Sequence, residues 1–65
     1  MTFADKVVIA RKELGLSQER LAAKLGVSFS TVNRWEKGRA KPSYLALEKF
    51  EELCNENNII FREEA

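Results

Sequence analysis

Apolar residues recur at steps of three and four along most of this chain, which is the spacing of helices that bury one face. The first stripe of this kind consists of Phe3, Val7, Ala10 and Leu14. Gly15 follows directly, and glycine often ends a helix because it adopts the left-handed backbone conformation without strain. The pattern therefore predicts a first helix that ends at Gly15.

A second helix is predicted over residues 18–25. Leu21 and Leu25 lie one turn apart, and the preceding Ser17 is a residue type that caps helix N-termini. Gly26 follows the last apolar position, so it would close this helix and turn the chain sharply. We expect a short helix that ends in a tight turn.

A third helix is predicted over residues 29–37, where Ser28 is the natural N-cap and Gly38 ends the segment. Its inward stripe consists of Val32 and Trp35. Because Trp35 lies in phase with Val32, we interpret it as a core residue and not as a base-stacking group.

A fourth helix is predicted after Pro42, a residue that suits a helix start, and it begins at Ser43. Apolar side chains expected to face inward from it are those of Leu45, Leu47, Phe50, Leu53 and Cys54. We interpret Cys54 as a small core residue.

The helical pattern stops in the run 55–58, and residues 59–61 form a short apolar run that favours β structure. A helical turn, a strand and a frayed end are all compatible with this run. It suits a dimer contact by strand pairing, or a cover over the domain's own core. We predict an all-α, compact bundle of four to five short helices, with residues 1–56 as the domain and 57–65 as a C-terminal tail.

Composition excludes several classes of function. The 65 residues make one domain, with no histidine and a single cysteine. Paired carboxylates and a phosphate-binding glycine loop are also missing, so we expect no catalytic residues, no metal site and no cofactor. No apolar run approaches the roughly 20 residues of a membrane span, and no signal peptide precedes the domain. We expect a soluble cytoplasmic protein that binds no membrane and shows no site for a small-molecule effector.

Charge is divided unevenly along the chain. Residues 1–47 hold nine Lys or Arg against four Asp or Glu, whereas residues 48–65 hold two against six. The basic excess is densest over residues 34–41. A positive body suits a polyanionic partner, although ordinary surface charge that happens to segregate is an equal alternative.

The second and third predicted helices meet the steric demands of a steep crossing over a short turn. Ala22 supplies the small residue at the crossing, and Gly26 supplies the turn. The apolar residues of the shared face are Leu21, Leu25, Val32 and Trp35. Residues 18–37 therefore favour a helix-turn-helix over an ordinary αα-hairpin.

The same residues resemble a known family. The motif is Ser17-Gln18-x-x-Leu21-Ala22-x-x-Leu25-Gly26-Val27-Ser28, followed by Thr31-Val32-x-Arg34-Trp35-Glu36-x-Gly38 and Pro42. It is similar to the phage repressor and Cro family of helix-turn-helix domains, of the xenobiotic-response-element type, over roughly residues 5–54. The resemblance implies a lambda-repressor-like DNA-binding domain. The C-terminal end departs from the family, which usually adds a fifth helix that residues 55–65 favour poorly.

The resemblance implies that the helix 29–37 enters the major groove of double-stranded DNA. The candidate base contacts are Phe29, Ser30, Asn33 and Arg34. Asn33 suits adenine, and Arg34 suits guanine or a phosphate. Phe29 has two open interpretations, contact with a thymine methyl group or packing on the domain's own core.

Phosphate contacts are implied around this helix by Gln18, Ser28, Thr31, Lys37, Arg39 and Lys41. Gln18 would bind through its backbone N–H at a helix N-terminus, with its side chain on a phosphate or a base. In the family, an Arg of the first helix pairs with the Glu of the third, so the resemblance implies a structural ion pair between Arg11 and Glu36.

We predict a small transcriptional regulator that binds DNA sequence-specifically, as a homodimer on a palindromic operator with half-sites about 34 Å apart. The alternative is a protein-interaction module of the same fold, acting as an antitoxin or anti-repressor. In that case Phe29 and residues 59–61 would anchor the partner.

Overall fold

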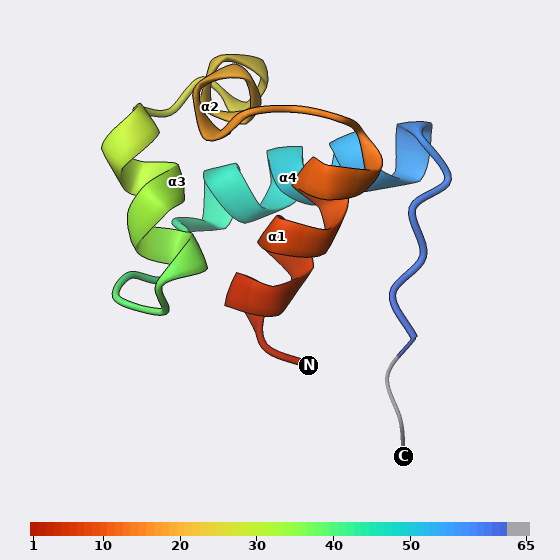
Figure 1. Ribbon diagram of the computed structural model, residues 1–65, viewed down its shortest axis with the longest axis horizontal. Helices are drawn as coiled ribbons and strands as arrows, with labels where there is room; N and C mark the ends of the chain where they lie inside the picture. Colours follow the sequence, from red (N-terminus) through yellow and green to blue (C-terminus); the bar gives the residue numbers. More distant parts are fainter. Residues whose placement is uncertain (63–65) are drawn as a thin grey trace.

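The computed structural model describes residues 1–62 and, over that range, contains four α-helices and no strand. The helices are α1 (Phe3–Glu13), α2 (Gln18–Leu25), α3 (Phe29–Glu36) and α4 (Tyr44–Glu56) (Figure 1). This confirms the predicted all-α fold with a helix-turn-helix. None of the described helices has the length and apolar character needed to cross a membrane.

Each helix begins after a hydroxyl side chain that accepts a hydrogen bond from a backbone N–H three residues later. These N-cap residues are Thr2, Ser17, Ser28 and Ser43. A cap of this kind stabilises a helix by about 1 kcal/mol, because it satisfies one of the N–H groups that lack a partner in the first turn. Local chemistry therefore sets where each helix starts.

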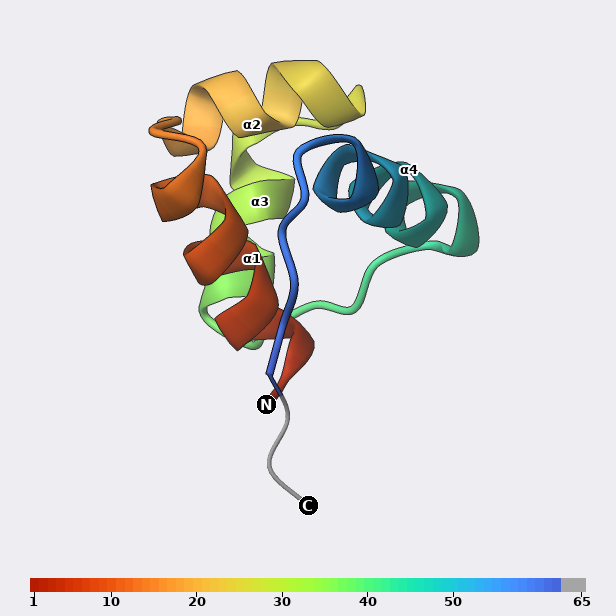
Figure 2. The ribbon, with the colours of Figure 1, turned by 90° about the vertical axis from the view of Figure 1, so that its right-hand side faces the viewer.

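The turn between α2 and α3 depends on Gly26, whose φ of 70° and ψ of 31° place it in the left-handed region. Its N–H donates to the carbonyl of Ala23, and the next N–H, of Val27, donates to the carbonyl of Ala22. Figure 2 shows the result, with α2 lying across the top of the molecule and α3 running steeply away beneath it.

The core is built from buried side chains of all four helices and from Ile59 of the tail. Phe3 of α1 packs edge-on against Trp35 at 5.4 Å and against Phe50 at 5.3 Å between ring centroids. Trp35 is only 2% exposed, which agrees with its interpretation as a core residue. Phe3 therefore joins α1 to α3 through Trp35 and to α4 through Phe50.

The inward face of α4 differs from the prediction at one position. Leu45, predicted to face inward, is 60% exposed, and Ala46, at 6%, is buried instead. The buried stripe is Ala46, Phe50 and Cys54, at four-residue steps. With 3.6 residues per turn, positions 45 and 47 point about 160° apart, so they cannot both lie on one stripe.

One helix end differs slightly from the prediction: α3 ends at Glu36, with Lys37 as its C-cap. α4 ends at Glu56, within the run 55–58 where the helical pattern was predicted to stop. Asn58 has a φ of 55°, a left-handed conformation that asparagine tolerates better than most residues.

The chain then turns back along the molecule as an extended tail, visible in Figures 1 and 2. Ile59 is 7% exposed in the core, and the ring of Phe61 stacks on Phe50 at 6.3 Å. Both side chains therefore cover the domain's own core, whereas Ile60 is 82% exposed. The part of the predicted tail at residues 63–65 lies outside the described residues.

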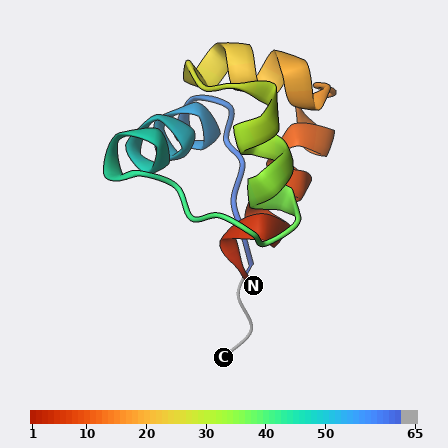
Figure 3. The same ribbon diagram turned by 90° about the vertical axis from the view of Figure 1, so that its left-hand side faces the viewer.

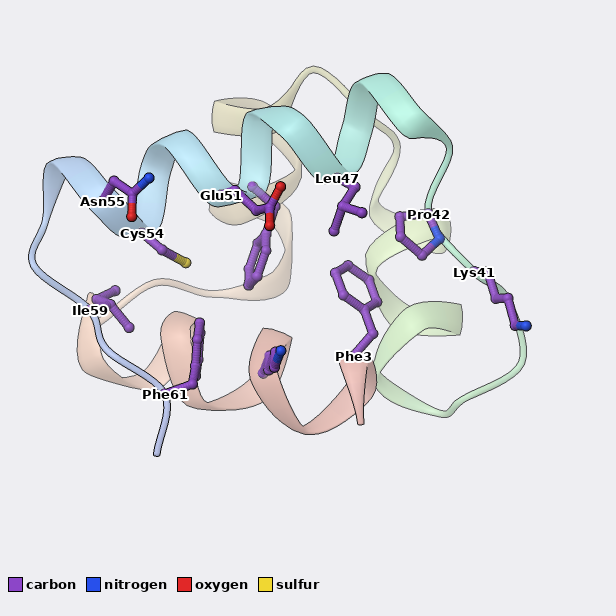
Figure 4. A pocket seen from close by; sticks show the side chains of 11 residues that line it. Phe3, Lys41, Pro42, Leu47, Glu51, Cys54, Asn55, Ile59 and Phe61 are labelled. Carbon is purple, nitrogen blue, oxygen red and sulfur yellow. The ribbon is translucent and has the colours of Figure 1, made fainter. Parts of the chain in front are cut away.

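Ile59 and Phe61 form one end of an open groove beside α4, and Phe3, Leu47 and Lys41 lie at the other (Figure 4). Its volume is about 780 Å³. The tail thus covers Phe50 on this side of α4, although its described residues do not form a helix.

Candidate functional site

The outer face of α3 is open to solvent. Val32 and Trp35 bury the opposite face, at 0% and 2% exposure, so the helix is held rigidly against the core. Figure 3 looks onto the outer face and shows no other element in front of it. The side chains that the sequence placed on this face are Phe29, Ser30, Asn33, Arg34 and Lys37. The structure brings all five to one surface, with Asn33 partly covered and the others exposed.

Phe29 opens this face at the N-terminus of α3. It is 49% exposed, compared with 2% for Trp35 on the inner side of the same helix. The interpretation in which Phe29 packs into the core therefore does not hold. An exposed aromatic side chain at this position is available to a binding partner.

Hydroxyl groups cluster at the start of α3. The Ser28 Oγ accepts from the Thr31 N–H at 3.1 Å and lies 2.8 Å from Thr31 Oγ1. Ser30 Oγ is 3.1 Å from the same Ser28 oxygen. The three hydroxyls therefore hold one another at the helix N-terminus, where the unpaired N–H groups favour an anion.

Cations surround the C-terminal half of α3. Arg34, Lys37, Arg39 and Lys41 are all exposed. None of their side chains forms a hydrogen bond or ion pair with another residue of the described range 1–62. Their charges are therefore available to an external anion.

Arg11 and Glu36 form an ion pair that joins α1 to α3. The Arg11 Nε donates to Glu36 Oε2 at 2.7 Å, and its Nη2 donates to Oε1 at 3.1 Å. Arg11 Nη1 also donates to the carbonyl of Leu16 at 3.2 Å. The side chains of Arg11 and Glu36 are 20% and 9% exposed, so the pair is largely shielded from water.

These contacts keep the Glu36 side chain ionised. Burial alone would raise the pKa of the Glu36 carboxyl, but hydrogen bonds from Arg11 and Gln18 outweigh it. The net effect places the pKa below its ordinary value. Glu36 is therefore an acceptor at neutral pH.

Gln18 has a role that the sequence did not indicate. Its Nε2 donates to Glu36 Oε1 at 3.0 Å, and its Oε1 accepts from Asn33 Nδ2 at 3.2 Å. The side chain that the resemblance places on a phosphate or a base is thus held between two residues of α3. Its backbone N–H lies in the first turn of α2 and keeps the predicted position for an anion.

A family model described as helix-turn-helix matches residues 9–57, which include α2, the turn and α3. The chain belongs to the Cro/C1-type helix-turn-helix family. α3 is therefore the second helix of the helix-turn-helix motif.

Curated relatives carry the same motif. A protein of Methanothermobacter thermautotrophicus named an uncharacterized HTH-type transcriptional regulator is 54% identical over 35 residues, 54% of this chain and 51% of the relative. A Sinorhizobium medicae protein of the same name is 30% identical over 61 residues, 94% of this chain and 44% of the relative. The chain thus spans about half the length of these helix-turn-helix relatives. No solved structure matches it significantly.

Proposed function

We propose that this domain binds double-stranded DNA sequence-specifically, with α3 in the major groove. The observation that carries the proposal is the outer face of α3, a rigid helix surface that combines polar side chains with cations that have no partner among residues 1–62. A helix of this width fits the major groove, where the four base pairs present different donors and acceptors. The names of the relatives, HTH-type transcriptional regulators, support the same function.

Base contacts are assigned to the first two turns of α3. Asn33 would bind adenine N6 and N7, and Arg34 would bind guanine O6 and N7 or a phosphate. Phe29 would pack on a thymine methyl group, and Ser30 would bond a neighbouring base edge. These four side chains carry the sequence preference.

Backbone contacts are assigned to the groups that flank α3. The Gln18 backbone N–H and the hydroxyls of Ser28 and Thr31 lie at helix N-termini, which suit phosphate oxygens. Lys37, Arg39 and Lys41 would bind phosphates beyond the other end of the helix. Their contribution to the affinity is electrostatic, so it weakens as the salt concentration rises. These contacts carry no sequence information.

The domain would act as a homodimeric transcriptional regulator in the cytoplasm, without catalysis, cofactor or small-molecule effector. Two copies on a palindromic operator would place their α3 helices about 34 Å apart. Because Ile59 and Phe61 pack on the core, the exposed Ile60 is the apolar side chain that remains for a dimer contact among the described tail residues 57–62. Sedimentation of the wild type and of Ile60→Asp would show whether the chain dimerises and whether Ile60 contributes.

The test of DNA binding is fluorescence anisotropy on a selected duplex across a range of salt concentrations. Lys37→Ala with Arg39→Ala should lower the slope of log affinity against log salt by roughly 2, about one for each phosphate that the variant no longer binds. Arg62→Ala is the control for removal of a positive charge elsewhere, because residues 57–62 lie on the side of the molecule opposite α3 (Figure 1). An unchanged slope in the double variant, or an equal change in the control, would contradict the assignment.

A protein partner is the second candidate, because Phe29 and Ile60 are large apolar side chains at 49% and 82% exposure. In this case the fold would serve an antitoxin-like or anti-repressor function. Phe29→Ala distinguishes the two: it should change base preference if the ring contacts DNA, and should leave DNA affinity unchanged if the ring binds protein.

A further inference from the structure

Four polar side chains form a continuous series of hydrogen bonds that begins in α1 and ends on the outer face of α3. Arg11 donates to Glu36 at 2.7 Å, Gln18 donates to Glu36 at 3.0 Å, and Asn33 donates to Gln18 at 3.2 Å. The first two members are largely buried, and the last is partly exposed beside the candidate base contacts. We call these four residues the relay.

The chemistry of the relay allows one direction of hydrogen bonding. The guanidinium of Arg11 can only donate, and the ionised carboxylate of Glu36 can only accept. Gln18 must therefore turn its NH2 group toward Glu36, which leaves its carbonyl oxygen facing α3. That oxygen can only accept, so Asn33 must turn its own NH2 group toward Gln18.

This direction determines what Asn33 presents to a ligand. A free asparagine carboxamide can turn over, since the rotation about its last side-chain bond is broad and nearly two-fold. In the relay, one N–H of Nδ2 is occupied by Gln18, so Oδ1 and the second N–H remain. An acceptor next to a donor matches N6–H and N7 of adenine, whereas guanine presents two acceptors at the same places.

We propose that Gln18 is a positioning residue that fixes the orientation of the Asn33 carboxamide, and that this orientation makes the domain select adenine over guanine at one base pair. The inference rests on the proposed function, because it requires Asn33 to face DNA. Gln18 acts through Asn33 and contributes no base contact of its own. The Arg11–Glu36 ion pair thereby determines, through Gln18, which base Asn33 prefers.

Two substitutions of Gln18 give opposite expectations. Gln18→Met keeps the length of the side chain but cannot hydrogen-bond, so the Asn33 amide is free to turn over. Gln18→Lys can still donate to Glu36, but toward Asn33 it can only donate, so it would draw Oδ1 inward and turn the NH2 group outward. An outward NH2 group suits the two acceptors of guanine.

The experiment compares affinities for duplexes that carry A·T or G·C at the base pair where Asn33→Ala abolishes discrimination. The wild type should prefer adenine by roughly five- to 150-fold, the range for a bidentate contact. Gln18→Met should reduce this preference at least about fivefold, and Gln18→Lys should reverse it toward guanine. Glu19→Gln is the matched control, because it adds the same charge as Gln18→Lys in the same turn of α2 and should leave the preference unchanged.

A second measurement uses the unaltered protein and therefore does not depend on whether the variants fold. Purine, which lacks the N6 amino group, and 7-deazaadenine, which lacks N7, should each weaken binding when placed at the Asn33 base pair. If neither weakens it, the assigned orientation is wrong. Melting of each variant, followed by circular dichroism, identifies any that fail to fold.

The outcomes separate the inference from the proposed function. If the wild type shows no specific affinity for duplex DNA, the proposed function fails and the inference fails with it. If the wild type binds specifically and Asn33→Ala abolishes discrimination, but folded Gln18→Met and Gln18→Lys still prefer adenine as the wild type does, the inference alone is overturned.

Discussion

Removing the Glu36 carboxylate should destabilise the domain by about 2 kcal/mol. Glu36→Ala eliminates two charge-assisted hydrogen bonds from Arg11 and one hydrogen bond from Gln18. An exposed ion pair contributes about 0.2–1 kcal/mol, whereas removing one partner of a buried pair costs about 3–5 kcal/mol. The exposures of 20% for Arg11 and 9% for Glu36 place this pair between those limits. For a domain of this size, 2 kcal/mol corresponds to a fall in Tm of about 8–16 °C.

Urea unfolding at pH 7, followed by circular dichroism, measures this loss, and a double-mutant cycle with Arg11→Ala isolates the pair. The cycle is needed because Arg11 also donates to the carbonyl of Leu16, a hydrogen bond that its truncation removes independently. We expect a coupling energy of about 1–2 kcal/mol. Glu48→Ala, an exposed glutamate of α4, serves as control and should change stability by less than about 0.5 kcal/mol.

The same pair predicts a dependence on pH. The pKa of Glu36 is lowered in the folded state, so its stabilisation is complete above the unfolded value of 4.5 and is lost as the pH falls through the lower folded value. The difference in the free energy of unfolding between the wild type and Glu36→Ala should therefore disappear as the pH falls below about 4.5. A coupling energy under about 0.5 kcal/mol at pH 7, or full stability of Glu36→Ala with an altered base preference, would refute the structural role of the pair.

Three further predictions concern the turn, the tail and the thiol. Gly26→Ala should cost about 1–2 kcal/mol in urea unfolding, because alanine is strained at a φ of 70°; an unchanged midpoint would contradict this. Phe61→Ala should destabilise the domain by about 2 kcal/mol through loss of the stack on Phe50, whereas Ile60→Ala should have little effect; equal effects would contradict the assigned packing. Cys54 should resist iodoacetamide at neutral pH until the protein unfolds, because burial and nearby Glu51 raise the pKa of its thiol; rapid alkylation of the native protein, measured by mass spectrometry, would disprove it.

The helix limits were predictable because they depend on local chemistry. Ser17 and Ser28 cap helices through their own backbone neighbours, and Gly26 adopts the left-handed conformation expected of it. The inward face of α4 was predicted less well, because helical spacing admits more than one apolar stripe there. Contact with the rest of the core selects the stripe through Ala46 and leaves Leu45 outside.

The candidate site was predictable in its surface and not in its internal contacts. Helical periodicity placed Ser30, Asn33 and Arg34 on the face opposite Val32, which requires only that α3 is a helix. The hydrogen bonds of Gln18 depend on how α2 crosses α3, and no local pattern specifies that crossing to the accuracy of a hydrogen bond. The packing of the tail could not be predicted for the same reason, since an apolar run indicates burial without indicating the surface against which it packs.

The central claim is that α3 and its flanking cations bind the major groove of duplex DNA. Selection from a pool of randomised duplexes, followed by a salt titration on the recovered sequence, tests it most directly. We expect one recurring sequence, and an affinity that falls about fortyfold per protomer between about 50 and 200 mM salt if Lys37, Arg39 and Lys41 each bind a phosphate. Recovery of no common sequence, or an affinity that stays constant over that range, would contradict the claim.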